Sequence, residues 1–141
     1  MFLLDTNVVS ELRRAAIGKA DANVVAWAAS VPVALQFISA LTVSELEYGV
    51  RLKEHSDPAQ GAMLRLWLET QVLPAFEGRT LPIDTLVALK CAPMHVPNRC
   101  KERDFFIAAT AMARGMTVVT RDLTDFAPTG ATLFNPWDWR A

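Results

Sequence analysis

The chain has 141 residues and a mass of 15.5 kDa, which is the size of one ordinary domain. Hydrophobic residues make up 52% of it and charged residues 21%, a balance that excludes an intrinsically disordered chain. The 14 basic and 15 acidic residues nearly cancel, and the net charge of −1 argues against a histone-like or strongly steered nucleic-acid binder.

In chain order, apolar runs typical of strands alternate with helical patterns. In the first half they predict a strand over 2–4, helices over 8–14 and 21–29, a strand over 34–39, a helix over 42–54, and a helix that begins at Pro58 and is ended by Pro74. An extended run over 80–83, a helix over 84–91 and an irregular stretch over 92–103 follow. The last part has a helix from about 103 to Gly115, a strand over 116–120, a turn region over 121–130 and a strand over 131–134. This alternation predicts an α/β fold whose mostly parallel sheet is covered by helices on both faces. No repeat or linker divides the chain, so we expect a single domain over residues 1–141.

Cysteine usage and hydropathy indicate the compartment. Cys91 and Cys100 are too few for a disulfide scaffold and lack the spacing of a zinc site, so we expect reduced thiols. His55 and His95 also lack metal-ligand spacing, and we expect both at the surface. No apolar run approaches the roughly 18 residues of a membrane span. We therefore expect a soluble, cytoplasmic protein without a membrane partner.

Acidic residues follow the ends of the predicted strands or open the helices beside them. Asp5 ends the first strand, and Glu45 lies one helical turn beyond the second. Asp104 begins the helix before the strand over 116–120, and Asp122 follows that strand, with Asp125 three residues further on. Carboxyl ends of parallel strands meet at one sheet edge, where such folds bind ligands. Carboxylates brought together there repel, so a cation has to neutralise them or some must protonate.

Each of the four acids also has a structural interpretation. Asp5 is placed to cap a helix, and Thr42 with Glu45 has the spacing of a capping box. Asp104 is placed to meet a helix dipole, and Asp122 to form an Asx-turn. The alternative to an enzyme is therefore a non-catalytic binding module whose acids cap helices.

The ligand chemistry favours a hard cation. Oxygen ligands without histidine suit Mg²⁺ or Mn²⁺ rather than zinc. A cation held in this way orients phosphates and lowers the pKa of a bound water, as hydrolysis of a phosphodiester requires. The sequence has no GxxxxGK[ST] phosphate loop and no GxGxxG after the first strand, which excludes the two commonest nucleotide-binding classes.

Four segments in register resemble the motifs of PIN-domain ribonucleases, especially the VapC-type toxins of the FitB-like branch. These segments are 2–11, 38–49, 103–111 and 118–126, and the tail over 133–137 resembles the ending of the same branch. The resemblance implies a PIN-like three-layer α/β/α sandwich with a short, mostly parallel central sheet. It also implies a Mg²⁺- or Mn²⁺-dependent endoribonuclease toxin, a VapB-like antitoxin that silences it, and a homodimer.

The resemblance maps the acidic site onto Asp5, Glu45, Asp104 and Asp122, with the supporting polar residues Asn7, Ser44 and Thr120. It departs from the family pattern at two places. Phe105 and Phe106 are bulkier than expected after the third acid, which predicts a reshaped pocket wall. The fourth acid has two candidates, of which we favour Asp122 because it is closer to the strand end, with Asp125 in reserve.

Basic and aromatic residues near the acids complete the hypothesis. The basic residues that adjoin them are Arg13, Arg14, Arg99, Lys101, Arg103 and Arg121. Arg103 and Arg121 are the favoured RNA contacts because each adjoins a proposed ligand. We expect Trp27 and Trp67 in the core, and Trp137 and Trp139 packed on the domain or in an interface.

The expected reaction is hydrolysis of an RNA phosphodiester by water that the metal activates. Asp5 and Asp104 would hold the principal metal, with Glu45 and Asp122 as direct or water-mediated ligands; one or two metals are both open. A flap-type or other PIN-like DNA nuclease is the competing enzyme. Setting the four acids aside leaves 11 acidic against 14 basic residues, a remaining charge of +3, so the near-neutral total does not exclude an RNA substrate.

Overall fold

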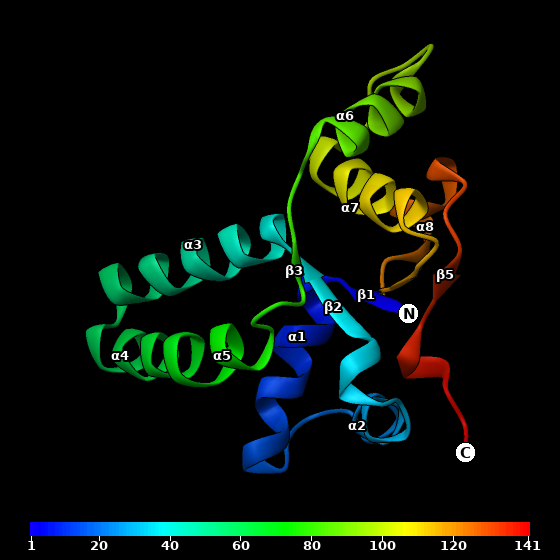
Figure 1. The fold of residues 1–141 in the computed structure, drawn as a ribbon. Coiled ribbons are helices and arrows are strands. Elements are labelled where there is room, and N and C mark those ends of the chain that lie inside the picture. The colour runs from blue at the N-terminus through cyan, green and yellow to red at the C-terminus, as the bar shows by residue number, and fades with distance from the viewer.

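Five short parallel strands form the central sheet of the computed structural model, which describes residues 1–141 (Figure 1). The strands are β1 (Phe2–Leu4), β2 (Gln36–Ser39), β3 (Thr80–Leu81), β4 (Thr117–Val119) and β5 (Leu133–Phe134). Their order across the sheet is β3-β2-β1-β4-β5, and all four pairings are parallel. The chain therefore leaves the centre in two directions, to β2 on one side of β1 and to β4 on the other. That reversal creates a crevice at the carboxyl ends of β1 and β4.

Eight α-helices connect and cover these strands (Figure 1). They are α1 (Thr6–Arg13), α2 (Ala22–Ser30), α3 (Ala40–Ser56), α4 (Pro58–Trp67), α5 (Leu73–Ala75), α6 (Thr85–Cys91), α7 (Glu102–Ala113) and α8 (Leu123–Phe126). Short 3₁₀ turns cover 14–17, 33–35, 92–95, 127–129 and 136–138. None of the helices is long and apolar enough to span a membrane.

Successive strand residues face opposite helical layers, since side chains alternate along a strand. Leu4 and Val119 are fully buried in a cluster with residues of α1, α2 and α3. Their neighbours Leu3 and Val118 are fully buried on the other face, where α7 contributes Ile107 and two alanines. Both faces of β1 and β4 are therefore covered, which confirms the predicted three-layer sandwich.

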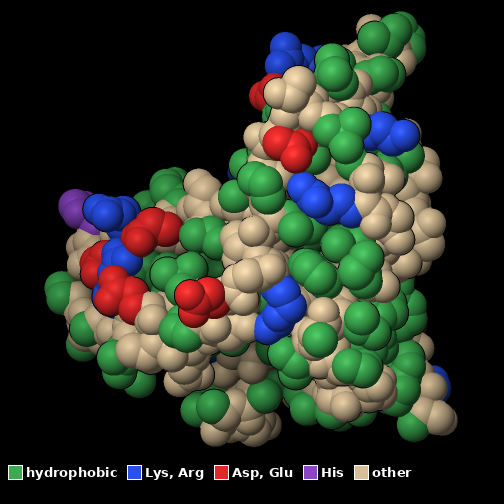
Figure 2. Space-filling view, viewed as in Figure 1, with side chains coloured by type: hydrophobic (Ala, Val, Ile, Leu, Met, Phe, Trp, Pro, Cys, Tyr) green, Lys and Arg blue, Asp and Glu red, His purple; other side chains and the backbone are tan.

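Helices α3 and α4 form an antiparallel arm that projects from the sheet (Figure 1). The two helices approach so closely at Gly61 that a Cβ atom there would overlap the backbone of Glu54. The guanidinium of Arg65 bridges the arm, with ion pairs of 2.6 Å to Glu47 and 2.9 Å to Glu54. Figure 2 shows acidic and basic side chains gathered over this arm.

Several predicted boundaries shift for local reasons. Helix α1 begins at Thr6 and not at residue 8, because Asp5 caps it. Strand β2 begins at Gln36 and not at residue 34, because residues 33–35 form a 3₁₀ turn after Pro32. Helix α3 begins at Ala40 and not at residue 42, because the Ser39 hydroxyl accepts the Leu41 N–H and caps the helix.

Two predicted irregular segments contain helices. Pro74 does not end the preceding helix, since a π-helical turn over 68–72 leads into α5, which contains Pro74. Such a wide turn accommodates a residue that has no N–H to donate. The turn region over 121–130 contains α8, and the stretch over 92–103 contains a 3₁₀ turn and the first residues of α7.

Histidine and tryptophan positions agree with the expectations in most cases. His55 is exposed, but His95 is half-buried and stacks on Phe105 with 4.8 Å between ring centroids, so the surface prediction for His95 is wrong. The indole of Trp27 is buried, and Trp67 packs partly exposed against the same core. The tail residues Trp137 and Trp139 also pack against this core. Both Cys91 and Cys100 are free thiols, as expected.

Candidate active site

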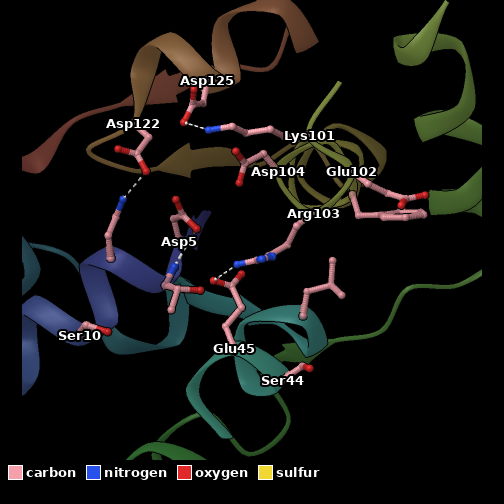
Figure 3. A pocket seen from close by; sticks show the side chains of 14 residues that line it. Asp5, Ser10, Ser44, Glu45, Lys101, Glu102, Arg103, Asp104, Asp122 and Asp125 are labelled. Atoms are coloured by element: carbon pink, nitrogen blue, oxygen red, sulfur yellow. Dashed lines mark hydrogen bonds and ion pairs between the residues drawn. The ribbon is translucent and has the colours of Figure 1, made fainter. Parts of the chain in front are cut away.

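The acidic residues line one cavity of about 1000 Å³ at the carboxyl ends of the strands (Figure 3). Asp5 follows β1 and Asp122 follows β4, so the two flank the crevice at the centre of the sheet. Glu45 reaches the cavity from α3, and Asp104 from the first turn of α7. The structure thus brings the four predicted acids to one place. Asp125, the reserve candidate from α8, also lines the cavity.

Asp5 is the most buried of these acids. The residue is 6% exposed, and its Oδ1 accepts the Thr6 N–H at 2.8 Å, as a helix cap does. The other oxygen accepts the hydroxyl of Thr120 at 2.8 Å. Burial raises the pKa of Asp5 from 3.8 to about 6, and the charges of Asp104 and Glu45 act in the same direction. The two hydrogen bonds oppose this increase, because they favour the ionised carboxylate.

A hydrogen-bonded chain connects Asp5 to Asp122. The Asn7 amide donates to Thr120 Oγ1 and to Asp122 Oδ2, both at 3.3 Å, and the Asp122 N–H donates to Thr120 Oγ1 at 3.0 Å. Two of the predicted supporting residues, Asn7 and Thr120, therefore connect two predicted acids. The Asp122 carboxylate accepts only the Asn7 amide and no backbone N–H, so neither an Asx-turn nor a helix cap describes it.

Glu45 and Arg103 form an ion pair of 2.9 Å across the cavity (Figure 3). The side chain of Glu45 is 21% exposed and that of Arg103 is 61% exposed. Since α3 is capped by Ser39, Thr42 is not a capping residue and the capping-box interpretation of Glu45 is wrong. Ser44, the third supporting residue, is exposed and lines the cavity beside Glu45.

The side chain of Asp104 lies between those of Lys101 and Arg103, which precede it in the chain (Figure 3). Burial is the main cause that raises the pKa of Asp104, and the charge of Asp125 is the next. Lys101 opposes this increase, and its ammonium forms an ion pair of 2.8 Å with Asp125. The contribution of Asp122 to the pKa of Asp104 ranks below that of Asp125. The sequence identified Lys101 only as one of the basic residues near the acids, because its partner Asp125 is 24 residues away along the chain.

Of the other residues singled out in the sequence, Phe106 lines the cavity, whereas Arg121 and Phe105 do not. The guanidinium of Arg121 lies over the indole of Trp137, 5.1 Å from the ring centroid, and does not line the cavity. Phe106 forms part of the cavity wall, as its bulk predicted, whereas Phe105 is buried in the core.

The donor set is suited to a hard cation, but its members are spread around the cavity. Every acidic group there offers carboxylate oxygens, with hydroxyl and amide oxygens beside them and no histidine. No three acidic, histidine or cysteine side chains converge closely enough to enclose an ion by themselves. Three of the carboxylates instead form ion pairs with basic side chains of the chain: Glu45 with Arg103, Asp125 with Lys101, and Glu102 with Arg99.

The model of the PIN domain family matches residues 2–129, the part of the chain that contains all of these acids. The chain belongs to the PIN-domain family. Among curated relatives, this PIN domain is 35% identical to the VapC ribonuclease Y4jK of Sinorhizobium fredii over 98% of the chain and 99% of that protein. It is 39% identical to Toxin FitB of Neisseria gonorrhoeae over 97% of the chain and 99% of that protein.

Solved structures agree with the family assignment. The crystal structure of FitAcB from Neisseria gonorrhoeae matches this PIN domain with a TM-score of 0.88 and 38% identity, over 99% of the chain and 100% of that chain. The structure of VapBC2 from Rickettsia felis bound to a promoter DNA fragment has a TM-score of 0.67 at 20% identity, over 99% of the chain and 98% of that chain. The second match supports the fold alone. The predicted family resemblance and fold class are therefore confirmed.

Proposed function

We propose that this PIN domain is a divalent-metal-dependent endoribonuclease that acts as the toxin of a VapBC-type toxin–antitoxin pair. The main support is a cavity lined by six carboxylates, of which the most buried, Asp5, has its pKa raised to about 6. Protein interiors do not hold such a group ionised without a compensating charge. Because relatives are named as a VapC ribonuclease and a FitB toxin, we expect that this compensating charge is a metal cation used in RNA cleavage.

The metal ligands of this proposal are Asp5, Asp104, Glu45 and Asp122, with Asp125 in reserve. Mg²⁺ is bound through a few carboxylates and keeps several waters, which suits acids that surround a wide cavity without meeting at one point. When bound, Mg²⁺ or Mn²⁺ orients phosphate oxygens, lowers the pKa of water and stabilises the charge that develops during hydrolysis.

The chain's own polar groups hold the acids in place. Thr6 and Thr120 each donate one hydrogen bond to Asp5, which fixes the rotation of its carboxylate. Asn7 donates to Asp122 and so orients the acid that follows β4. We assign the contact with the RNA phosphates to Arg103, which lines the cavity. Arg121, predicted for the same role, would first have to leave the indole of Trp137.

Partners and domain extent belong to the same proposal. The solved relatives include FitAcB, VapBC2 and a toxin-antitoxin complex from Klebsiella pneumoniae, and on that basis we extend a VapB-like antitoxin to this chain. The homodimer belongs to the proposal through the family resemblance alone. We also propose that residues 1–141 act as one domain, because the tail over 133–137 contributes β5 and part of the core.

The non-catalytic alternative has lost part of its support, because neither Glu45 nor Asp122 caps a helix. The experiment that decides between the two measures thermal unfolding with and without Mn²⁺. Binding to the folded state raises the melting temperature by mass action, so we expect a rise for the native chain and none for Asp104→Asn. Equal rises in both chains, or none in either, would contradict the metal site.

The alternative of a DNA nuclease is tested by incubating the native chain with RNA and DNA strands of matched sequence, since a DNA nuclease would cleave the DNA.

A further inference from the structure

Two basic side chains that flank Asp104 reach opposite walls of the acidic cavity. Lys101 stands at the N-cap position of α7 and contacts Asp125 of α8, while Arg103 in the first turn contacts Glu45 of α3 (Figure 3). Asp104 lies between the two pairs (Figure 3). Both cations therefore neutralise carboxylates of the cavity from within the chain.

The ion pair between Lys101 and Asp125 is exposed enough for another cation to replace the lysine. The lysine side chain is 66% exposed and the Asp125 side chain 37% exposed, although their charged atoms are only 2.8 Å apart. Exposed pairs of this kind contribute little to stability, so another cation can replace the lysine at low cost. Three carboxylates act on the ammonium group, those of Asp125, Asp104 and Asp122. A divalent cation placed among the same carboxylates would compete with it directly.

Resting on the proposed function, we infer that Lys101 is a metal-released phosphate contact. Without metal its ammonium neutralises Asp125, and with metal it turns from Asp125 to a phosphate of the RNA. The released lysine still lines the cavity that an RNA strand must enter to reach the acids. An ammonium on a flexible stem suits this exchange, because it binds phosphate as a point charge without a fixed geometry. Lys101 is then a positioning residue whose contact with RNA depends on the metal.

The test compares Lys101→Gln with Lys90→Gln, a matched loss of charge on the exposed Lys90 of α6, away from the cavity. The first measurement is Mn²⁺ binding by isothermal titration calorimetry without RNA. We expect Lys101→Gln to bind Mn²⁺ about two- to fivefold more tightly than the control, because the competing cation is gone. Lys101→Arg keeps the charge and should bind Mn²⁺ like the native chain.

The second measurement is binding of a fluorescein-labelled, phosphorothioate-linked RNA strand at several salt concentrations, with Mn²⁺ or with EDTA. A single phosphate contact to a single strand contributes about 0.7 to the slope of log affinity against log salt. In Mn²⁺ we expect the slope of Lys101→Gln to be smaller than that of Lys90→Gln by about this amount. In EDTA we expect equal slopes, because the native lysine is then held by Asp125.

Tighter metal binding together with a metal-dependent loss of RNA contact supports the inference, since a merely structural lysine would not move the two affinities in opposite directions. Equal Mn²⁺ affinities of Lys101→Gln and Lys90→Gln, or equal salt slopes of RNA binding in Mn²⁺, overturn the inference about Lys101. If the native chain still cleaves RNA, the proposed function is unaffected by that result. A native chain that binds no Mn²⁺ and cleaves no RNA overturns both.

Discussion

Replacing Asp5 by asparagine should make the metal-free protein more stable. Asp5 is a buried residue, 6% exposed, and its pKa is raised from 3.8 to about 6, mainly by burial. The folded protein therefore keeps this proton up to about pH 6, whereas the unfolded chain releases it near 3.8. Folding binds the extra proton between these values, so the free energy of unfolding falls as pH rises through this window and stays low above it.

The difference between the two pKa values corresponds to about 3 kcal/mol at neutral pH. Asparagine cannot ionise, and its oxygen can still accept the Thr6 N–H that the aspartate accepts. We therefore expect Asp5→Asn to gain up to about 3 kcal/mol at pH 7, where each kcal/mol corresponds to roughly 2–4 °C in melting temperature. The gain should vanish near pH 4, where the native Asp5 is protonated in the folded state.

Urea unfolding in EDTA across this pH range measures the effect, and the exposed Asp138 supplies the control Asp138→Asn. A burial cost at Asp5 is excluded if Asp5→Asn has the pH dependence of the native chain, or if it is less stable than the native chain at pH 7. With Mn²⁺ the order should reverse, because only the native chain gains stability from the metal.

Two further predictions concern the support of Asp5 and the packing of the arm. Thr120→Val removes the buried hydroxyl that donates to Asp5, which should cost about 1.5–3 kcal/mol in urea unfolding and raise the pH at which metal stabilisation begins. Unchanged values would contradict the role of this bond. Gly61→Ala forces a Cβ onto the Glu54 backbone and should destabilise by about 1–3 kcal/mol, whereas Gly49→Ala, in open space on α3, should stabilise by about 1 kcal/mol. The same sign for both variants would refute the close approach.

The gathering of the acids follows from topology, which is why it was predictable. Asp5 and Asp122 follow strands and Glu45 lies in the second turn of the helix after β2, and parallel strands bring their carboxyl ends to one edge. The exact start of α3 was not predictable, because Ser39 and Thr42 are both good caps and only the end of β2 decides between them.

Contacts between distant segments were the features that sequence periodicity could not supply. Lys101 meets Asp125 across 24 residues, since α7 and α8 pack side by side only in the folded chain. Arg121 adjoins a proposed ligand in the sequence, yet the tail places Trp137 beneath its guanidinium and draws it from the cavity. Both outcomes depend on long-range packing rather than on local pattern.

Whether the acidic cavity hydrolyses RNA through a bound metal is decided by cleavage of RNA by the purified chain in Mg²⁺, with Asp5→Asn and Asp138→Asn assayed beside it. We expect the native chain and Asp138→Asn to cleave RNA and EDTA to stop both. We expect Asp5→Asn to lose about a hundredfold or more in rate, since a bound metal contributes several kcal/mol to such reactions. Cleavage by Asp5→Asn at the native rate, or undiminished cleavage in EDTA, would contradict it.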